Sequence, residues 1–166
     1  MNKAYMQQAI SEAQAGIHAG HGGPFGCVIV KDGKVIGSGH NEVLKQRDPT
    51  CHGEVVAIRD ACKNLNSHDL SGAVLYTTAE PCPMCLGAIL WANIEQVYYG
   101  CNIQDTDNIG FRDEVFYRVA TPEGKAKLLQ ECERDSCLAG EGAVVGVAAP
   151  VARTQRCPRC AACGCW

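Results

Sequence analysis

The sequence lacks a strong charge of either sign, because 15 basic and 18 acidic residues leave a formal net charge of −3 over 166 residues. Proteins that hold phosphate backbones generally carry a basic surface, so this balance disfavours a nucleic-acid partner. No apolar run can cross a bilayer, since the longest, 143–152, is interrupted by Gly146 and Pro150. The first eight residues lack the basic stub and apolar run of a secretion signal. We therefore expect a cytoplasmic protein without membrane contact, and its length indicates one globular domain.

Disulfide bonds are not expected, although the chain contains 12 cysteines. In a reducing compartment, metal binding and core packing explain cysteines better than a disulfide scaffold does. Cys82 and Cys85 form one close pair. Four others crowd the last ten residues: Cys157, Cys160, Cys163 and Cys165. The remaining six are scattered: Cys27, Cys51, Cys62, Cys101, Cys132 and Cys137.

Periodic apolar residues indicate the first elements of the fold. Between Met6 and Ile17 they recur at helical spacing, so we expect the chain to open with an amphipathic helix. Two short apolar runs, 27–30 and 35–36, flank the dipeptide Asp32-Gly33, which is a strong hairpin signal. Two paired strands are therefore predicted after the first helix.

The next part of the chain alternates helices and strands. Helical spacing follows Asp48-Pro49-Thr50, and Thr50 or Asp48 is the expected helix cap. The run 73–77 is typical of a buried strand and leads directly into a helix that opens around Pro81. A further strand is expected at 97–99. This alternation predicts an α/β domain with helices on both faces of a sheet.

Three side chains in these segments have the chemistry of a zinc site. A catalytic zinc needs about three protein ligands and an open position for water, and thiolate and imidazole are preferred donors. His52 lies in the first turn of one predicted helix. Cys82 and Cys85 lie three residues apart in the first turn of the next, so both thiols can face one ion. A helix N-terminus also favours the thiolate form.

A carboxylate accompanies these ligands. Glu54 follows His52 in an H-x-E motif, and Pro81 precedes the cysteines in a P-C-x-x-C motif, which together are the signature of zinc-dependent base deaminases. Zinc lowers the pKa of a bound water from about 15.7 toward about 7, and Glu54 would carry its proton to a ring nitrogen. The alternatives are a redox pair or structural half-site for the cysteines, and a solvated helix-start carboxylate for Glu54.

From residue 1 to about 138 the chain resembles the cytidine deaminase superfamily, and within it most closely the bacterial guanine deaminases. Four motifs are shared widely among base and tRNA deaminases: GGPFG at 22–26, GHN at 39–41, DPTCHGE at 48–54 and EPCPMCLGA at 80–88. The segment GFRD at 110–113 is more discriminating, because guanine deaminases carry an acidic residue there that reads the purine edge.

The resemblance implies roles for three further residues. Asn41 would hydrogen-bond the base, and Phe25 would pack against its plane. Asp113 would accept the adjacent N–H donors of guanine, which suits an ionised carboxylate. Each also has an ordinary structural interpretation, because Asn41 could be a turn residue, Phe25 a core residue and Asp113 a helix cap.

The resemblance also implies a three-layer α/β/α fold with a mixed five-stranded sheet, in which 127–133 is a late strand. The composition of this segment alone is ambiguous between helix and strand. Family members form homodimers, and in guanine deaminases the C-terminal segment can cross to the partner and close its active site. We therefore expect a homodimer, with domain swapping as an option, and one zinc ion per chain.

The C-terminal tail departs from the family pattern. We predict a deaminase domain over 1–138, whereas 139–166 is a tail rich in Gly, Ala, Val and Cys through which no amphipathic face can be drawn. Our hypothesis is that this end is not ancestral, for example through a shifted reading frame. The rival interpretation is a second zinc held by its four cysteines. The other histidines, His18, His21, His40 and His68, are expected to be solvated.

Three functions fit the sequence. The first is zinc-dependent deamination of a free purine base by water, from guanine to xanthine and ammonia. The second is another deaminase on the same scaffold, acting on cytosine, a nucleoside or tRNA adenosine, of which the tRNA activity calls for a basic surface. The third is a zinc-binding module without activity.

Overall fold

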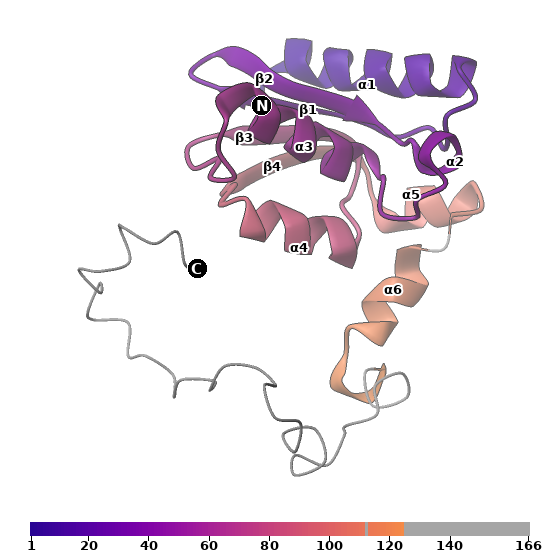
Figure 1. The fold of residues 1–166 in the computed structure, drawn as a ribbon. Helices are drawn as coiled ribbons and strands as arrows, with labels where there is room; N and C mark the ends of the chain where they lie inside the picture. Colours follow the sequence, from indigo (N-terminus) through magenta and orange to yellow (C-terminus); the bar gives the residue numbers. More distant parts are fainter. Residues whose placement is uncertain (112, 125–166) are drawn as a thin grey trace, which may run out of the picture. The chain divides into compact units, whose positions relative to one another are not determined.

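The computed structural model of the protein describes residues 1–111 and 113–124. Ten elements follow one another in this part of the chain (Figure 1). In order they are α1 (Lys3–His18), β1 (Gly26–Lys31), β2 (Lys34–His40), α2 (Val43–Gln46), α3 (Gly53–Leu65), β3 (Val74–Ala79), α4 (Pro83–Trp91), β4 (Gln96–Cys101), α5 (Ile103–Asn108) and α6 (Asp113–Val119).

The strands form one mixed sheet in the order β2-β1-β3-β4. β1 pairs antiparallel with both β2 and β3, whereas β3 pairs parallel with β4. A parallel neighbour requires a crossover connection, which here is α4. The predicted α/β class is therefore confirmed. The described residues form four strands where we expected five, and the expected strand at 127–133 lies outside them.

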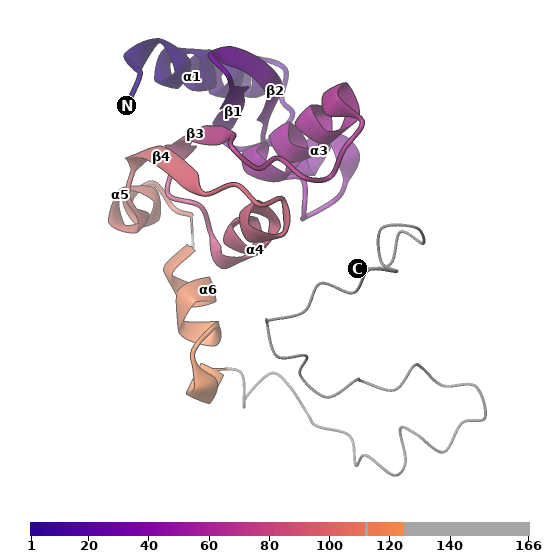
Figure 2. The same ribbon diagram turned by 90° about the vertical axis from the view of Figure 1, so that its left-hand side faces the viewer.

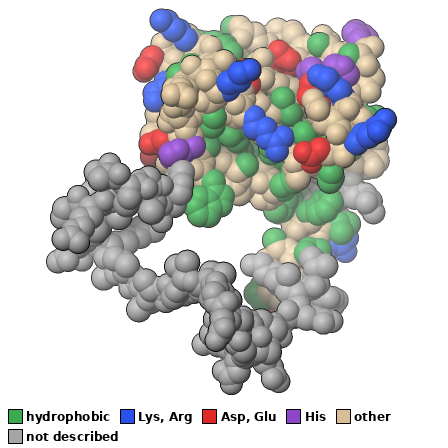
Figure 3. Space-filling model, in the orientation of Figure 1, with side chains coloured by type: hydrophobic (Ala, Val, Ile, Leu, Met, Phe, Trp, Pro, Cys, Tyr) green, Lys and Arg blue, Asp and Glu red, His purple; other side chains and the backbone are tan. Residues whose placement is uncertain are grey.

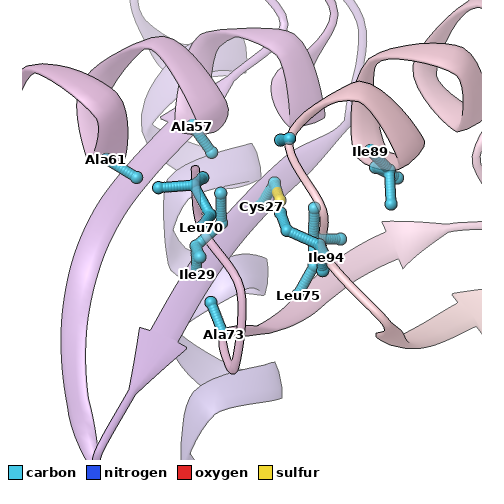
Figure 4. Close-up of a cluster of buried hydrophobic side chains, with 10 residues drawn as sticks. Cys27, Ile29, Ala57, Ala61, Leu70, Ala73, Leu75, Ile89 and Ile94 are labelled. Atoms are coloured by element: carbon cyan, nitrogen blue, oxygen red, sulfur yellow. The ribbon is translucent and has the colours of Figure 1, made fainter. Parts of the chain in front are cut away.

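Helices cover both faces of the sheet, with α1 on one face and α3 and α4 on the other (Figures 1 and 2). Side chains alternate across β1, so each face has its own apolar cluster. Cys27 and Ile29 lie in the cluster beneath α3 and α4, which Figure 4 shows in close-up. Val28 and Val30 pack on the opposite face with Ala9 of α1.

The hairpin between β1 and β2 turns at Asp32-Gly33, as the sequence indicates. Both residues have positive φ, 50° and 74°, the conformation required by a two-residue turn that matches strand twist. The predicted first helix is also confirmed by α1. The strand predicted at 73–77 overlaps β3, which begins one residue later, and the strand predicted at 97–99 lies within β4.

The expected helix cap at Thr50 or Asp48 is wrong. α3 begins at Gly53 with His52 as its N-cap residue, and His52 makes no side-chain capping hydrogen bond. Asp48 instead accepts hydrogen bonds from the backbone N–H and the hydroxyl of Thr50, which stabilises the turn before the helix. These local bonds compete with capping, because short polar side chains close turns as readily as helix ends.

The cysteines of the described residues are all unpaired, as expected for metal binding and core packing. Cys27 is fully buried in the cluster beneath α3, and burial raises its thiol pKa well above the usual value. No helix among residues 1–111 and 113–124 has both the length and the apolarity needed to span a membrane.

Candidate metal centre and active site

Two helix N-termini meet at the site. His52 is the N-cap residue of α3, and Cys82 is the N-cap residue of α4, each with extended backbone angles. Pro83 occupies the first turn of α4, where its fixed φ and missing N–H fit without cost. Neither N-cap side chain caps its own helix. Each is turned toward the other helix, and Cys85 joins them from the first turn of α4.

The donor atoms of His52, Cys82 and Cys85 converge at metal-ligand spacing. His52 Nδ1 lies 3.6 Å from the Sγ atoms of both Cys82 and Cys85. Zinc bonds of about 2.0 to 2.3 Å in a tetrahedron place a nitrogen and a sulfur ligand about 3.6 Å apart. The three residues therefore fit zinc in both donor type and spacing.

The two thiols cannot both ionise easily without a cation. A hydrogen bond from Cys85 lowers the pKa of Cys82 to about 4. The same hydrogen bond and burial raise the pKa of Cys85. The two thiols thus shift each other's pKa in opposite directions, and a divalent cation would supply the charge that stabilises both as thiolates.

Glu54 lies beside this centre and is only 6% exposed. Its Oε1 accepts a hydrogen bond from the Thr77 hydroxyl at 3.3 Å, and its Oε2 accepts one from Cys85 Sγ at 3.5 Å. Burial raises the pKa of the Glu54 carboxyl group. A carboxyl group with a raised pKa exchanges protons more readily near neutral pH, which suits a proton carrier.

Thr77 is a polar contact that the sequence analysis did not single out. It is 1% exposed in β3, the strand that precedes Cys82, and its hydroxyl orients the Glu54 carboxylate. The available signal was a hydroxyl-bearing residue at the end of an otherwise apolar run, 73–77. Such a residue usually needs a hydrogen-bond partner when it is buried.

Gly53 lets the backbone just before β1 pack closely against the start of α3. A Cβ atom at Gly53 would lie 3.2 Å from the Phe25 carbonyl oxygen, tighter than most real contacts. The backbone at Phe25 therefore packs directly against the turn that holds His52 and Glu54. Phe25 is half-buried, and its ring meets that of Phe111 edge to face with centroids 4.7 Å apart.

Asn41 is buried next to this aromatic pair. Its backbone N–H donates to the Phe25 carbonyl, and its Oδ1 accepts from the Val43 N–H. The second bond is the turn interaction that offers a structural interpretation of Asn41. Gly22 packs against the same side chain, because a Cβ there would fall 2.0 Å from Asn41 Oδ1. The loops carrying Gly22, Phe25 and Asn41 are thus tightly coupled.

The segment after β4 contacts the residue that precedes the zinc-type ligand Cys82. The Tyr117 hydroxyl of α6 donates a hydrogen bond to the Pro81 carbonyl, immediately before Cys82. Asp113, the predicted purine contact, is the first residue of α6, and its side chain lies outside the described part of the structure. This hydrogen bond therefore joins α6 to the residue that precedes Cys82.

An α/β/α domain with a His-Cys-Cys centre and a buried carboxylate beside it belongs to the class of zinc-dependent hydrolases. Comparison with known families gives a match over residues 1–101 to the cytidine and deoxycytidylate deaminase zinc-binding region. The chain belongs to this family, and zinc is its cofactor.

Two curated relatives are similar to this chain over most of their length. Guanine deaminase of Bacillus subtilis is 48% identical over 117 residues, which cover 70% of this chain and 75% of the relative. The tRNA-specific adenosine deaminase of Buchnera aphidicola is 33% identical over 114 residues, which cover 69% of this chain and 74% of the relative.

Solved structures agree with these matches. The crystal structure of the Bacillus subtilis guanine deaminase has a TM-score of 0.74 and 44% identity, covering 82% of this chain and 89% of that chain. A variant protein solved in complex with 8-azaguanine has a TM-score of 0.63 and 34% identity, covering 66% of this chain and 64% of that chain. These neighbours confirm the cytidine-deaminase-like fold expected from the sequence.

Proposed function

We propose that this protein converts guanine and water to xanthine and ammonia. The observation that carries the proposal is a buried carboxylate, Glu54, within hydrogen-bond distance of one of three converging metal-type ligands. The substrate rests on the similarity to a guanine deaminase at 48% identity. The neighbour bound to 8-azaguanine, a purine analogue, supports a free purine base as ligand.

His52, Cys82 and Cys85 would hold the zinc ion. When bound there, zinc supplies Lewis acidity that makes water nucleophilic at neutral pH. The water oxygen adds to the ring carbon that bears the amino group, and the bond between that carbon and the amino nitrogen breaks. All atoms of guanine and water are then accounted for in xanthine and ammonia.

Glu54 moves the protons of this reaction. Its carboxylate takes one proton from the water and delivers it to a ring nitrogen, which makes the amino-bearing carbon electrophilic. A further proton goes to the departing amine. Thr77 holds Oε1 by a hydrogen bond, so Oε2 is the oxygen that faces the metal ligands.

The base would be held by Asn41, Phe25 and Asp113. Burial of Asn41 against Gly22 restricts its amide, and the edge-to-face pair with Phe111 restricts the Phe25 ring. Asp113 at the start of α6 would accept two N–H donors of guanine. Water and a small purine base are thus the proposed reactants.

A tRNA adenosine deaminase is the second candidate, because several relatives at 33 to 42% identity are tRNA-specific adenosine deaminases. Its substrate requires a basic surface for the phosphate backbone. The face in Figure 3 shows Lys and Arg side chains intermixed with Asp and Glu, and the net charge of the chain is −3. These charges favour a free base over tRNA.

A substrate panel tests the proposal. Ammonia release is measured with guanine, adenine, cytosine, guanosine, cytidine and adenosine, and inosine formation is measured in tRNA. We expect turnover of guanine to exceed that of every other substrate by at least tenfold. Preferential inosine formation in tRNA would replace this proposal with the second candidate. Zinc binding without turnover of any of these substrates would favour the third hypothesis, a zinc-binding module without activity.

We also propose a cytoplasmic homodimer whose catalytic domain spans 1–138. Four exposed apolar side chains on one short helix support an interface on α4: Met84, Leu86, Leu90 and Trp91. Trp91 is 79% exposed, an unusual position for so large an apolar group in a monomer. Light scattering of the Trp91→Glu variant tests this, since the charge should convert a dimer to a monomer.

A further inference from the structure

A second group of metal-type ligands lies outside the zinc centre. His21 Nδ1 and His40 Nε2 are 2.8 Å apart, and Glu42 Oε1 lies 4.0 Å from the first and 3.7 Å from the second. The sequence led us to expect both histidines to be solvated. They are instead partly buried, with side-chain exposures of 26% and 15%, and their rings stack.

The His40 ring is held in a ligating orientation. Glu12 of α1 accepts a hydrogen bond from His40 Nδ1 at 3.2 Å, which leaves Nε2 with its lone pair directed at His21 and Glu42. A carboxylate behind a histidine ring is the usual outer partner of a metal-ligating histidine. Gly16 makes room for this ring, since a Cβ there would lie 2.6 Å from His40 Cδ2.

The spacing of the three donor atoms matches a coordination polyhedron. Bonds of about 2.1 Å from nitrogen and oxygen to a tetrahedral cation place ligands about 3.4 Å apart. The observed separations of 2.8, 3.7 and 4.0 Å lie on both sides of that value. Shifts of a few tenths of an ångström in partly exposed side chains are enough to equalise them.

Two side chains hold the Glu42 carboxylate in place. Lys45 Nζ donates a hydrogen bond to Oε1, and Gln46 Nε2 donates one to Oε2 at 2.9 Å. Lys45 Nζ is 2.6 Å from Glu42 Oε1, so its ammonium group lies where the proposed metal ion would bind this oxygen. Lys45 is 43% exposed and can swing into solvent when a doubly charged ion arrives.

We propose that His21 Nδ1, His40 Nε2 and Glu42 Oε1 form a second site for a divalent transition-metal cation of the zinc class. Two imidazoles and one carboxylate are ligands that such cations accept, and solvent completes the coordination. His40 and Glu42 flank Asn41, and His21 precedes Gly22. Occupancy would therefore clamp together the two loops that position Asn41.

Cobalt(II) titration of the full-length protein, with the zinc centre already loaded with zinc, tests the proposal. Binding is followed by visible absorption and calorimetry. We expect one further ion to bind and to raise the melting temperature. Its spectrum should lack the intense near-ultraviolet sulfur-to-cobalt charge-transfer band, because the site contains no thiolate. That band would place the additional cobalt on thiolate ligands and overturn the assignment.

Variants assign the ion to its ligands. His21→Gln and Glu42→Gln should each abolish the additional binding, and Glu12→Gln should weaken it by about 10- to 100-fold. His18→Gln is the matched control, because His18 is exposed at the end of α1 and outside the cluster. Unchanged affinity in both His21→Gln and Glu42→Gln, or no binding to the wild type at millimolar cobalt, would overturn the proposal.

Discussion

The two clusters of potential metal ligands in this protein differ in donor type and in support. His52, Cys82 and Cys85 gather where two helices begin, and their thiols are buried. His21, His40 and Glu42 gather where α1 ends and β2 ends, are partly exposed and contain no sulfur. Soft thiolates in a buried setting bind zinc tightly, whereas imidazole and carboxylate near solvent bind it more weakly. Both clusters have three ligands, but their donor types differ. The His52-Cys82-Cys85 centre is therefore expected to hold its zinc permanently, whereas the His21-His40-Glu42 site is expected to exchange its ion.

Removing a thiolate should have the largest effect. In Cys85→Ser, we expect the zinc content of the purified protein to fall from one ion per chain to near zero, and guanine turnover to be lost with it. A hydroxyl replaces a zinc ligand and also leaves Glu54 Oε2 with an altered partner. Elemental analysis and ammonia release check this. Cys101→Ser is the control, because Cys101 is an exposed free cysteine and should leave zinc content unchanged.

Disturbing Asn41 should have an intermediate effect on binding. We expect Asn41→Ala to raise the KM for guanine about tenfold, which corresponds to the loss of one hydrogen bond. Gly22→Ala should act in the same direction, because the new methyl group would displace the Asn41 amide. Both variants should retain one zinc ion. A change in zinc content at Asn41→Ala would show that this residue supports the metal centre and not the substrate.

Substitution of Asp69 in a surface turn should give the smallest effect, and this effect should disappear in acid. Hydrogen bonds from Ser71 and Asn93 lower the pKa of Asp69 from 3.8 to about 2. Because the folded pKa is lowered, the turn contributes stability above about pH 4, and this contribution disappears as the pH falls through about 2. Urea unfolding should show Asp69→Asn to be less stable than wild type at pH 7, with the difference vanishing near pH 2. An equal difference at both pH values would contradict the assignment.

The contrast between the clusters also marks what the sequence could predict. The H-x-E and P-C-x-x-C motifs are local, so they predicted the three zinc-type ligands that the structure brings together, whereas the catalytic role of Glu54 stays a prediction. Helical spacing likewise located α1, the Asp32-Gly33 dipeptide located the hairpin, and the apolar run at 73–77 located β3 to within one or two residues. Local patterns report what a segment does by itself, and these features are of that kind.

The second cluster depends on contacts that no local pattern contains. His21 and His40 are 19 residues apart and meet because α1 packs across β2, with Gly16 making room for the His40 ring. The N-cap of α3 also depended on packing, since Thr50 is held by Asp48 while His52 turns toward α4. The role of Asp113 stays a prediction, because its side chain lies outside the described residues.

The Glu54→Gln variant tests the central claim most directly, with zinc content and guanine turnover measured on the same preparation. Glutamine keeps the size and the hydrogen bond to Thr77 but cannot carry a proton at neutral pH. The account predicts that zinc stays bound at one ion per chain while ammonia release falls by about 10²- to 10⁴-fold. Unchanged turnover with zinc in place would contradict it.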